Sequence, residues 1–255
     1  GYASNALGTI NPVKKMTQMA HQAGALVYVD AVQYAPRGPI DVQDLDVDFL
    51  ACSAYKFYGP HIGILYGRYD LLDELMAYKV RPASDELPWK FETGTPSFEG
   101  IAGVLGALEY FEWLGTKFGG ESKIRFEGDF KGRALHLKQG LAVIQDYEYQ
   151  LSKKLLETLG SVQGLRIYGM DDIKDVEERV PTFAVNLEGV HPRQLAKALD
   201  ERDIYVWDGN YYAICATERL GVEDTGGMVR IGAAHYNTRE EIDKLGEALV
   251  DISKL

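Results

Sequence analysis

Short apolar runs alternate with amphipathic stretches along the first half of the chain. Such runs are typical of buried strands, and helical periodicity between them is typical of βαβ units. The pattern predicts a helix at 13–23 and strands at 25–29, 48–52 and 63–66. We therefore expect residues 1–130 to form an α/β domain with a mainly parallel sheet.

The second half of the chain has longer helical periods. Helices are expected at 132–159, 192–202 and 238–252, and strands at 165–168, 182–186, 204–207 and 228–231. The last helix has a start signal, because Thr238 and Glu241 have the spacing of a capping box. Residues 131–255 should form a smaller C-terminal α+β domain.

Composition limits the classes of function. The chain has 255 residues, 46% hydrophobic and 25% charged, with a net charge of -11 and no cluster of Lys and Arg. Nucleic acid is therefore not an expected partner. No apolar run approaches the ~20 residues that span a bilayer, so we expect no membrane association and a cytoplasmic location. Cys52 and Cys215 suit a reducing compartment, and the five His residues have no metal-ligand spacing, so no metal is expected.

Two strand ends carry residues that suit chemistry. Asp30 ends an apolar strand, which places a carboxylate where α/β sheets bind ligands, although aspartate is also a common turn residue. Lys56 follows the next strand among aromatic and small residues. Such an amine suits Schiff-base chemistry with an aldehyde cofactor, although taken alone a solvent-exposed lysine is the simpler interpretation. Pyridoxal phosphate (PLP) requires this combination of amine, acid and phosphate donors.

Several blocks of the chain resemble cysteine desulfurases and selenocysteine lyases of the class V aminotransferases. They lie in this order: residues 4–12, the Asp30/Gln33 pair, 53–66, 91–96, and 230–238. The resemblance implies a PLP-dependent transferase-like fold (fold type I), with residues 1–130 as part of the large domain. In this family an upstream part of that domain precedes the first block, and the chain is expected to lack it.

The resemblance also implies roles for the cofactor-binding residues. Lys56 would form the internal aldimine and move protons, and Asp30 would keep the pyridine nitrogen protonated. Gln33 would donate to the phenolic oxygen, and Ser53 would bind the phosphate. Tyr55 would supply a phenol to the phosphate where relatives commonly have an imidazole.

The remaining implied residues concern the substrate and a second subunit. Asn5 and Arg230 would receive the carboxylate of a small amino acid, and for Arg230 this agrees with the bidentate geometry of a guanidinium. Thr95 would reach the cofactor phosphate of a neighbouring subunit, which implies a homodimer.

One loop departs from the family pattern. Trp207 stands where desulfurases have a second arginine, and Tyr212 stands where they have the sulfur-accepting cysteine. Cys215 lies three residues later. A phenol cannot replace a nucleophilic thiol, so the reaction stays open between desulfuration, other β-elimination, transamination, epimerisation and kynureninase-like cleavage.

Two other classes of function are alternatives. A truncated or non-catalytic remnant would keep the fold and the dimer surface, but it would have little reason to retain Lys56, Asp30, Gln33 and Arg230 together. A dinucleotide-binding oxidoreductase is excluded, because no G-x-G-x-x-G motif follows a predicted strand.

Overall fold

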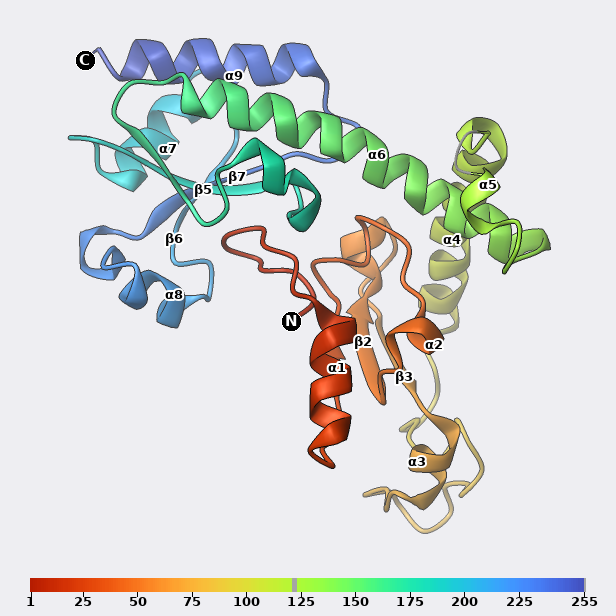
Figure 1. The fold of residues 1–255 in the computed structure, drawn as a ribbon. Coiled ribbons are helices and arrows are strands. Elements are labelled where there is room, and N and C mark those ends of the chain that lie inside the picture. Colours follow the sequence, from red (N-terminus) through yellow and green to blue (C-terminus); the bar gives the residue numbers. More distant parts are fainter. Residues whose placement is uncertain (121–122, 255) are drawn as a thin grey trace. The chain divides into compact units, whose positions relative to one another are not determined.

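The computed structural model describes residues 1–120 and 123–254, and the chain divides into two compact units (Figure 1). The first unit contains Gly1–Tyr2 and Pro12–Val143, and the second contains Ala3–Asn11 and Ile144–Leu255. The division falls inside helix α6 (Gly132–Gly160), so no Gly- or Pro-rich linker marks it. The domain boundary at residue 130 stays a prediction.

The first unit is built on a small mixed sheet. Its elements before α6 are α1 (Val13–Gln22), β1 (Tyr28–Asp30), α2 (Val42–Leu45), β2 (Phe49–Ser53), β3 (Gly63–Gly67), α3 (Tyr69–Glu74), α4 (Phe98–Phe118) and α5 (Lys123–Phe126). The strand order is β1-β2-β3. The expected parallel pairing holds between β1 and β2, whereas β3 follows the connection 54–62 and pairs antiparallel with β2.

The structure shifts one strand of this unit and adds a helix that the pattern did not specify. The strand expected at 25–29 begins only at Tyr28, because Asp48 Oδ2 accepts the amide hydrogen of Val27 at 2.6 Å. Helix α4 begins after Ser97, whose hydroxyl accepts from the Gly100 amide at 3.3 Å. It packs closely on α6, since a side chain at Gly140 would meet the Phe111 carbonyl.

The second unit is built on an antiparallel sheet with strand order β4-β5-β7-β6. Its elements after α6 are β4 (Leu165–Tyr168), β5 (Thr182–Leu187), α7 (Pro192–Asp200), β6 (Trp207–Gly209), α8 (Ile214–Arg219), β7 (Met228–Gly232) and α9 (Arg239–Ile252). The strand expected at 204–207 lies further along the chain, because its pairing with β7 begins at Trp207. The predicted capping box of Thr238 and Glu241 is confirmed.

The two faces of this sheet have different partners. Helices α6, α7 and α9 cover one face and supply most of the largest hydrophobic cluster (Figure 1). That cluster includes Leu151, Leu155, Leu195, Leu199, Leu245 and Leu249 from the helices, with Phe183, Val185, Val229 and Ile231 from the strands. The opposite face packs a smaller cluster with Ala6 and Tyr211. Because side chains alternate along a strand, Ala184 and Arg230 point to this second face.

Candidate functional site

The strand pairing in the first unit brings two chain segments to one edge of the sheet. In the parallel β1–β2 pair, Asp30 is opposite Ala51, and the Ala31 amide donates to the Ala51 carbonyl at 2.8 Å. Both strands therefore end at the same edge, with Asp30 on one and Ser53 on the other. The carboxyl edge of parallel strands is where α/β sheets bind ligands.

Asp30 is exposed at this edge. Its Oδ1 accepts from the Val32 amide at 2.9 Å, which fixes the turn after β1 and directs the carboxylate. Gln33 lies half-buried in the same turn. The acid and the amide that the sequence singled out therefore follow the same strand end.

Lys56 lies in a short 3₁₀ helix, Ala54–Phe57, directly after β2. The amide of Gly59 donates to the Ala54 carbonyl at 2.9 Å and closes this turn. Ser53 is its N-cap residue, but the hydroxyl makes no capping hydrogen bond. The half-buried Lys56 amine lies 5.2 Å from the centroid of the Tyr55 ring. Across the described part of the chain it makes no hydrogen bond and no ion pair, so the amine is available for chemistry.

Two aromatic rings, those of Tyr55 and His61, belong to the segment around Lys56. Tyr55 and His61 stack with centroids 4.9 Å apart and planes 22° apart. The position of His61 after the Lys56 turn was the only sequence signal for this contact. Thr95 lies exposed in the segment before α4, and over the described residues no hydrogen bond links it to the Lys56 turn.

The second unit brings Asn5 and Arg230 together, although 225 positions separate them. Arg230 Nη1 donates to the Asn5 carbonyl at 3.0 Å, and Asn5 Nδ2 donates to the Tyr211 carbonyl at 2.8 Å. The Arg230 guanidinium carbon lies 5.0 Å from the Tyr211 ring and 6.0 Å from the Trp207 ring. Partial burial lowers the pKa of Arg230, which stays a cation at neutral pH.

The segment that carries Asn5 is fixed to strand β5. Gly8 has a φ of +77°, and a side chain there would meet the Thr182 carbonyl. The Val180 amide donates to the Gly8 carbonyl at 2.8 Å. The buried Arg179 donates to the carbonyls of Thr182, at 2.7 Å, and of Leu7. These bonds hold the main chain that follows Asn5.

The loop that departs from the family pattern has unusual backbone geometry. Tyr211 and Tyr212 both have left-handed φ values, 52° and 62°. The Tyr211 ring is buried and its hydroxyl has no hydrogen-bond partner among the described residues, and burial raises its pKa. Tyr212 is 99% exposed, and Cys215 is exposed in α8. Tyr211 has no role among the sequence-based expectations, because no local pattern predicts a left-handed backbone at two successive tyrosines.

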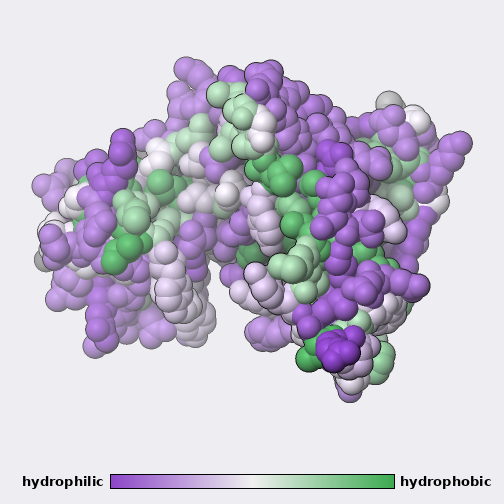
Figure 2. Space-filling view, turned by 90° about the horizontal axis from the view of Figure 1, so that it is seen from below, coloured by the Kyte–Doolittle hydropathy of each residue, from purple (hydrophilic) through white to green (hydrophobic). Residues whose placement is uncertain are grey.

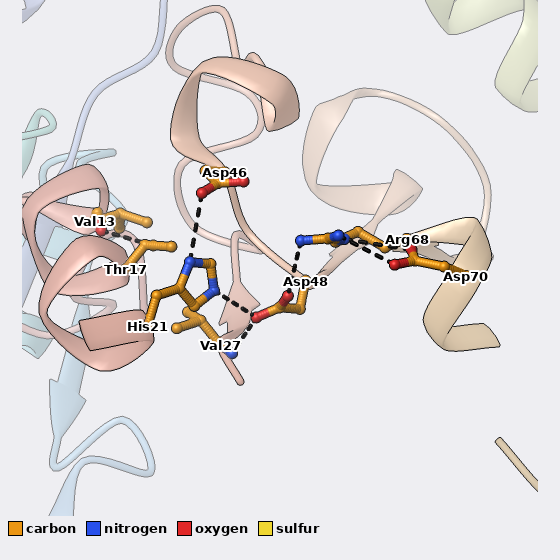
Figure 3. A network of polar contacts seen from close by, with 8 residues as sticks. All are labelled: Val13, Thr17, His21, Val27, Asp46, Asp48, Arg68 and Asp70. Atoms are coloured by element: carbon orange, nitrogen blue, oxygen red, sulfur yellow. Dashed lines mark hydrogen bonds and ion pairs between the residues drawn. The ribbon is translucent and has the colours of Figure 1, made fainter. Parts of the chain in front are cut away.

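Figure 3 shows a second polar network in the first unit, which the sequence did not reveal. Asp48 accepts from His21 Nε2 at 2.9 Å and from the Val27 amide, and its Oδ1 lies 3.7 Å from Arg68 Nη1. Asp48 precedes β2, at the end of the strand away from Lys56. We therefore assign this network a structural role.

The mixed α/β unit and the antiparallel second unit together define the fold of PLP-dependent transferases of fold type I. A cysteine desulfurase from Thermococcus onnurineus NA1 superposes with a TM-score of 0.80 at 28% identity, covering 99% of this chain and 58% of its own. The cysteine desulfurase CsdA (S-sulfonic acid) from Escherichia coli gives a TM-score of 0.76 at 29% identity, covering 100% of this chain and 58% of its own.

Residues 1–123 and 132–245 match the family model for aminotransferase class-V, and the chain belongs to this family of PLP-dependent enzymes. A cysteine desulfurase from Pectobacterium atrosepticum is 36% identical over 265 residues, covering 99% of this chain and 57% of the relative. One from Haloferax volcanii is 31% identical and covers 97% and 54%. The chain thus spans little more than half the length of these relatives.

No helix within residues 1–120 and 123–254 is long and apolar enough to cross a membrane. In the same ranges, no group of three or more His, Cys, Asp or Glu residues is arranged to hold a metal ion.

Proposed function

We propose that this chain carries the lysine of a PLP-dependent enzyme that acts on a small, free amino acid. Its chemistry would resemble that of a cysteine desulfurase, a selenocysteine lyase or an aminotransferase. The observation that carries the proposal is the parallel pairing of β1 and β2, which brings Asp30 to the same sheet edge as Ser53 and the Lys56 turn. Membership of the class-V family supports it.

The residues at this edge fit the cofactor. The Lys56 amine and the Ser53 hydroxyl are not used by the local fold, and Asp30 presents an exposed carboxylate. An amine, an acid and a hydroxyl are the groups that PLP needs for its aldehyde, its ring nitrogen and its phosphate. PLP, when bound, supplies an electron sink that weakens the bonds at the substrate Cα.

Each residue of the edge then has a separate task. Lys56 Nζ would hold the cofactor covalently and afterwards carry a proton to or from the substrate Cα. Asp30 would hold the proton on the pyridine nitrogen. Gln33 would donate to the phenolic oxygen, and Ser53 and Tyr55 would bind phosphate oxygens. Because Tyr55 stacks on His61, its ring is already oriented before any ligand arrives.

In the second unit, Asn5 and Arg230 would bind the substrate carboxylate. Within the described residues, the Arg230 guanidinium donates one hydrogen bond, to the Asn5 carbonyl. Its other N–H groups remain for a bidentate contact with a carboxylate. Tyr212 would replace the sulfur-accepting cysteine of the desulfurases. A phenol does not form a persulfide, so we expect β-elimination, transamination or epimerisation in preference to sulfur transfer.

We also propose a homodimer in which Thr95 binds the cofactor phosphate of the partner subunit. A groove of 880 Å³ lies between β3 and the first turns of α4, close to Thr95 in the chain. Exposed apolar side chains line it: Ile64, Leu65, Phe98, Ile101 and Leu105. Figure 2 shows hydrophobic residues reaching the surface in patches. Exposed apolar patches of this kind mark interfaces in soluble proteins, and sedimentation analysis of Ile101→Glu against wild type tests this one.

The experiment that tests the enzyme proposal is the absorbance spectrum of the purified protein with added PLP, before and after borohydride. We expect a band in the near-ultraviolet to visible range, and mass mapping should find the reduced adduct on Lys56. Lys56→Ala should lose the band. Lys138→Ala is the matched control, because this half-buried lysine already donates to the Ile40 carbonyl at 2.6 Å.

The alternative, a non-catalytic protein that keeps the fold, gives a different result. It predicts no band with PLP in the wild-type protein. An adduct on lysines other than Lys56 would also contradict the assignment.

A further inference from the structure

A row of side chains crosses the sheet of the second unit at Arg230. Arg230 on β7 is directly opposite Ala184 on β5 and Trp207 on β6, and Ala184 is opposite Tyr168 on β4. Directly opposed residues in antiparallel strands point to the same face, with Cβ atoms ~5 Å apart. Trp207 is therefore the immediate neighbour of Arg230, and it is 60% exposed.

Arg230 is half-buried, and its guanidinium contacts Asn5 and Tyr211. Arg230 Nη1 donates to the Asn5 carbonyl at 3.0 Å, and the Tyr211 ring lies 5.0 Å away. A guanidinium has five N–H donors, and in the described part of the chain only this one bond uses them. The others can bind a carboxylate, which Arg prefers to hold with two parallel hydrogen bonds.

The backbone is strained to keep the Tyr211 ring beside Arg230. Tyr211 and Tyr212 both have left-handed φ values, which bulky residues rarely adopt. Two side-chain bonds hold the loop: Asn5 Nδ2 to the Tyr211 carbonyl at 2.8 Å, and Asn210 Nδ2 to Glu223 Oε1 at 3.0 Å. Strained positions that the surrounding structure fixes in this way cluster at ligand sites.

We propose that Arg230 and Trp207 form a binding site that selects carboxylates bearing a planar apolar group. The carboxylate binds the free edge of the guanidinium, and the planar group packs on the exposed indole of Trp207. A small aliphatic acid leaves the indole uncovered and gains only the charged contact. This inference rests on the proposed function, since the carboxylate is that of the amino-acid substrate. It changes the expected substrate class from a small amino acid to one with an aromatic or otherwise flat side chain.

Protection of Arg230 from phenylglyoxal, read by peptide mass mapping, tests the site without any cofactor. The probes are 3-phenylpropionate and propionate, which carry the same charge and differ by the phenyl ring. Stacking and burial of one ring predict protection of Arg230 at about tenfold lower concentration of 3-phenylpropionate. Trp207→Ala should abolish this preference, and Trp207→Phe should keep most of it.

The chain supplies matched controls. Arg166 on β4 has its guanidinium carbon 4.7 Å from the Tyr168 ring and is exposed, so the same peptide map should show it modified with either probe present. Trp113→Ala removes another tryptophan, 52% exposed, from the first unit and should leave the preference unchanged. Equal protection by both acids in the wild-type protein overturns the proposal, as does a preference that survives Trp207→Ala.

The outcome is independent of the Lys56 experiment. A missing PLP adduct on Lys56 with selective protection of Arg230 would reject the enzyme and keep the binding site. The reverse pattern would keep the enzyme and reject the selectivity.

Discussion

Two buried charges, one in each unit, are accommodated in different ways. Asp48, with 1% of its surface exposed, lies beside the imidazole of His21 and the guanidinium of Arg68 (Figure 3). Arg179, with 0% exposed, donates to main-chain carbonyls and packs on the Phe183 ring, 3.6 Å from its centroid. No carboxylate of a described residue lies within ion-pair distance of Arg179.

The two kinds of contact differ in how they respond to pH. A carboxylate that pairs with an imidazole stabilises the fold by an amount that changes when either group gains or loses a proton. Carbonyl oxygens do not titrate, and burial lowers the pKa of Arg179 only to about 10, so this guanidinium stays charged at neutral pH. The contacts of Asp48 should therefore respond to pH near neutrality, where the contacts of Arg179 do not.

Replacing Arg179 with Met should have the largest effect. The carbonyls of Leu7, Met170 and Thr182 would lose their donor, and a buried acceptor left without a partner costs ~1–3 kcal/mol. Relief of the burial cost of the guanidinium offsets part of this, so we expect a net loss of about 3 kcal/mol. Urea unfolding measures the loss, and amide exchange should show residues 3–11 opening first.

Arg166→Met is the matched control for that change. Arg166 also has an aromatic neighbour but is exposed, so the free energy of unfolding should change by no more than about 0.5 kcal/mol. Equal urea midpoints for the two variants would contradict a stabilising role for the Arg179 carbonyl contacts.

Replacing Asp48 with Asn should have the next largest effect. The Val27 amide and His21 Nε2 would lose a charged acceptor, and we expect a loss of about 2 kcal/mol. Asp46→Asn is the control, because Asp46 is exposed, lies 3.4 Å from the other nitrogen of the same imidazole, and has a left-handed φ that asparagine also accepts. The free energy of unfolding of Asp46→Asn should lie within about 0.5 kcal/mol of the wild-type value.

Local signals explain which parts of the fold followed from the sequence. The α9 start was predicted because the capping box of Thr238 and Glu241 is a contact within one turn. The strand expected at 204–207 was displaced, because its position is set by pairing with β7 and not by its own apolar pattern. Likewise, Val27 gives its amide to the Asp48 side chain, a tertiary contact that shortens β1.

The residues of the candidate sites also fall into those with a local sequence signal and those that depend on tertiary contacts. Asp30 and Lys56 stand at strand ends, so the alternation of strand and turn was enough to single them out. The pairing of Asn5 with Arg230 joins the two ends of the chain and came only from the family resemblance. The Asp48 network and the Tyr211 ring depend on side chains from separate elements, which no local pattern reports.

The smallest expected effect is the pH dependence of the His21–Asp48 pair in the first unit. Hydrogen bonding to Asp48 raises the pKa of His21, so its contribution to stability is full below the unfolded pKa of ~6.5 and is lost as pH rises through the higher folded value. Burial opposes ionisation of Asp48, but the bonds from His21 and Val27 outweigh it and lower its pKa. The stabilising contribution of Asp48 is fully present above the unfolded carboxyl pKa of ~3.9, and it is lost as pH falls through the lower pKa of the folded state.

Amide exchange of β2 should therefore be slowest between about pH 4 and 6.5, after correction for the intrinsic exchange rate. In His21→Gln, the loss of β2 protection on the alkaline side of this window should disappear, and the loss on the acid side should remain. Exchange of residues 3–11, which Arg179 holds, should show neither limb over the same range. A matching alkaline loss of protection at 3–11 would show that the His21–Asp48 pair is not its source, because the guanidinium of Arg179 does not titrate in that window.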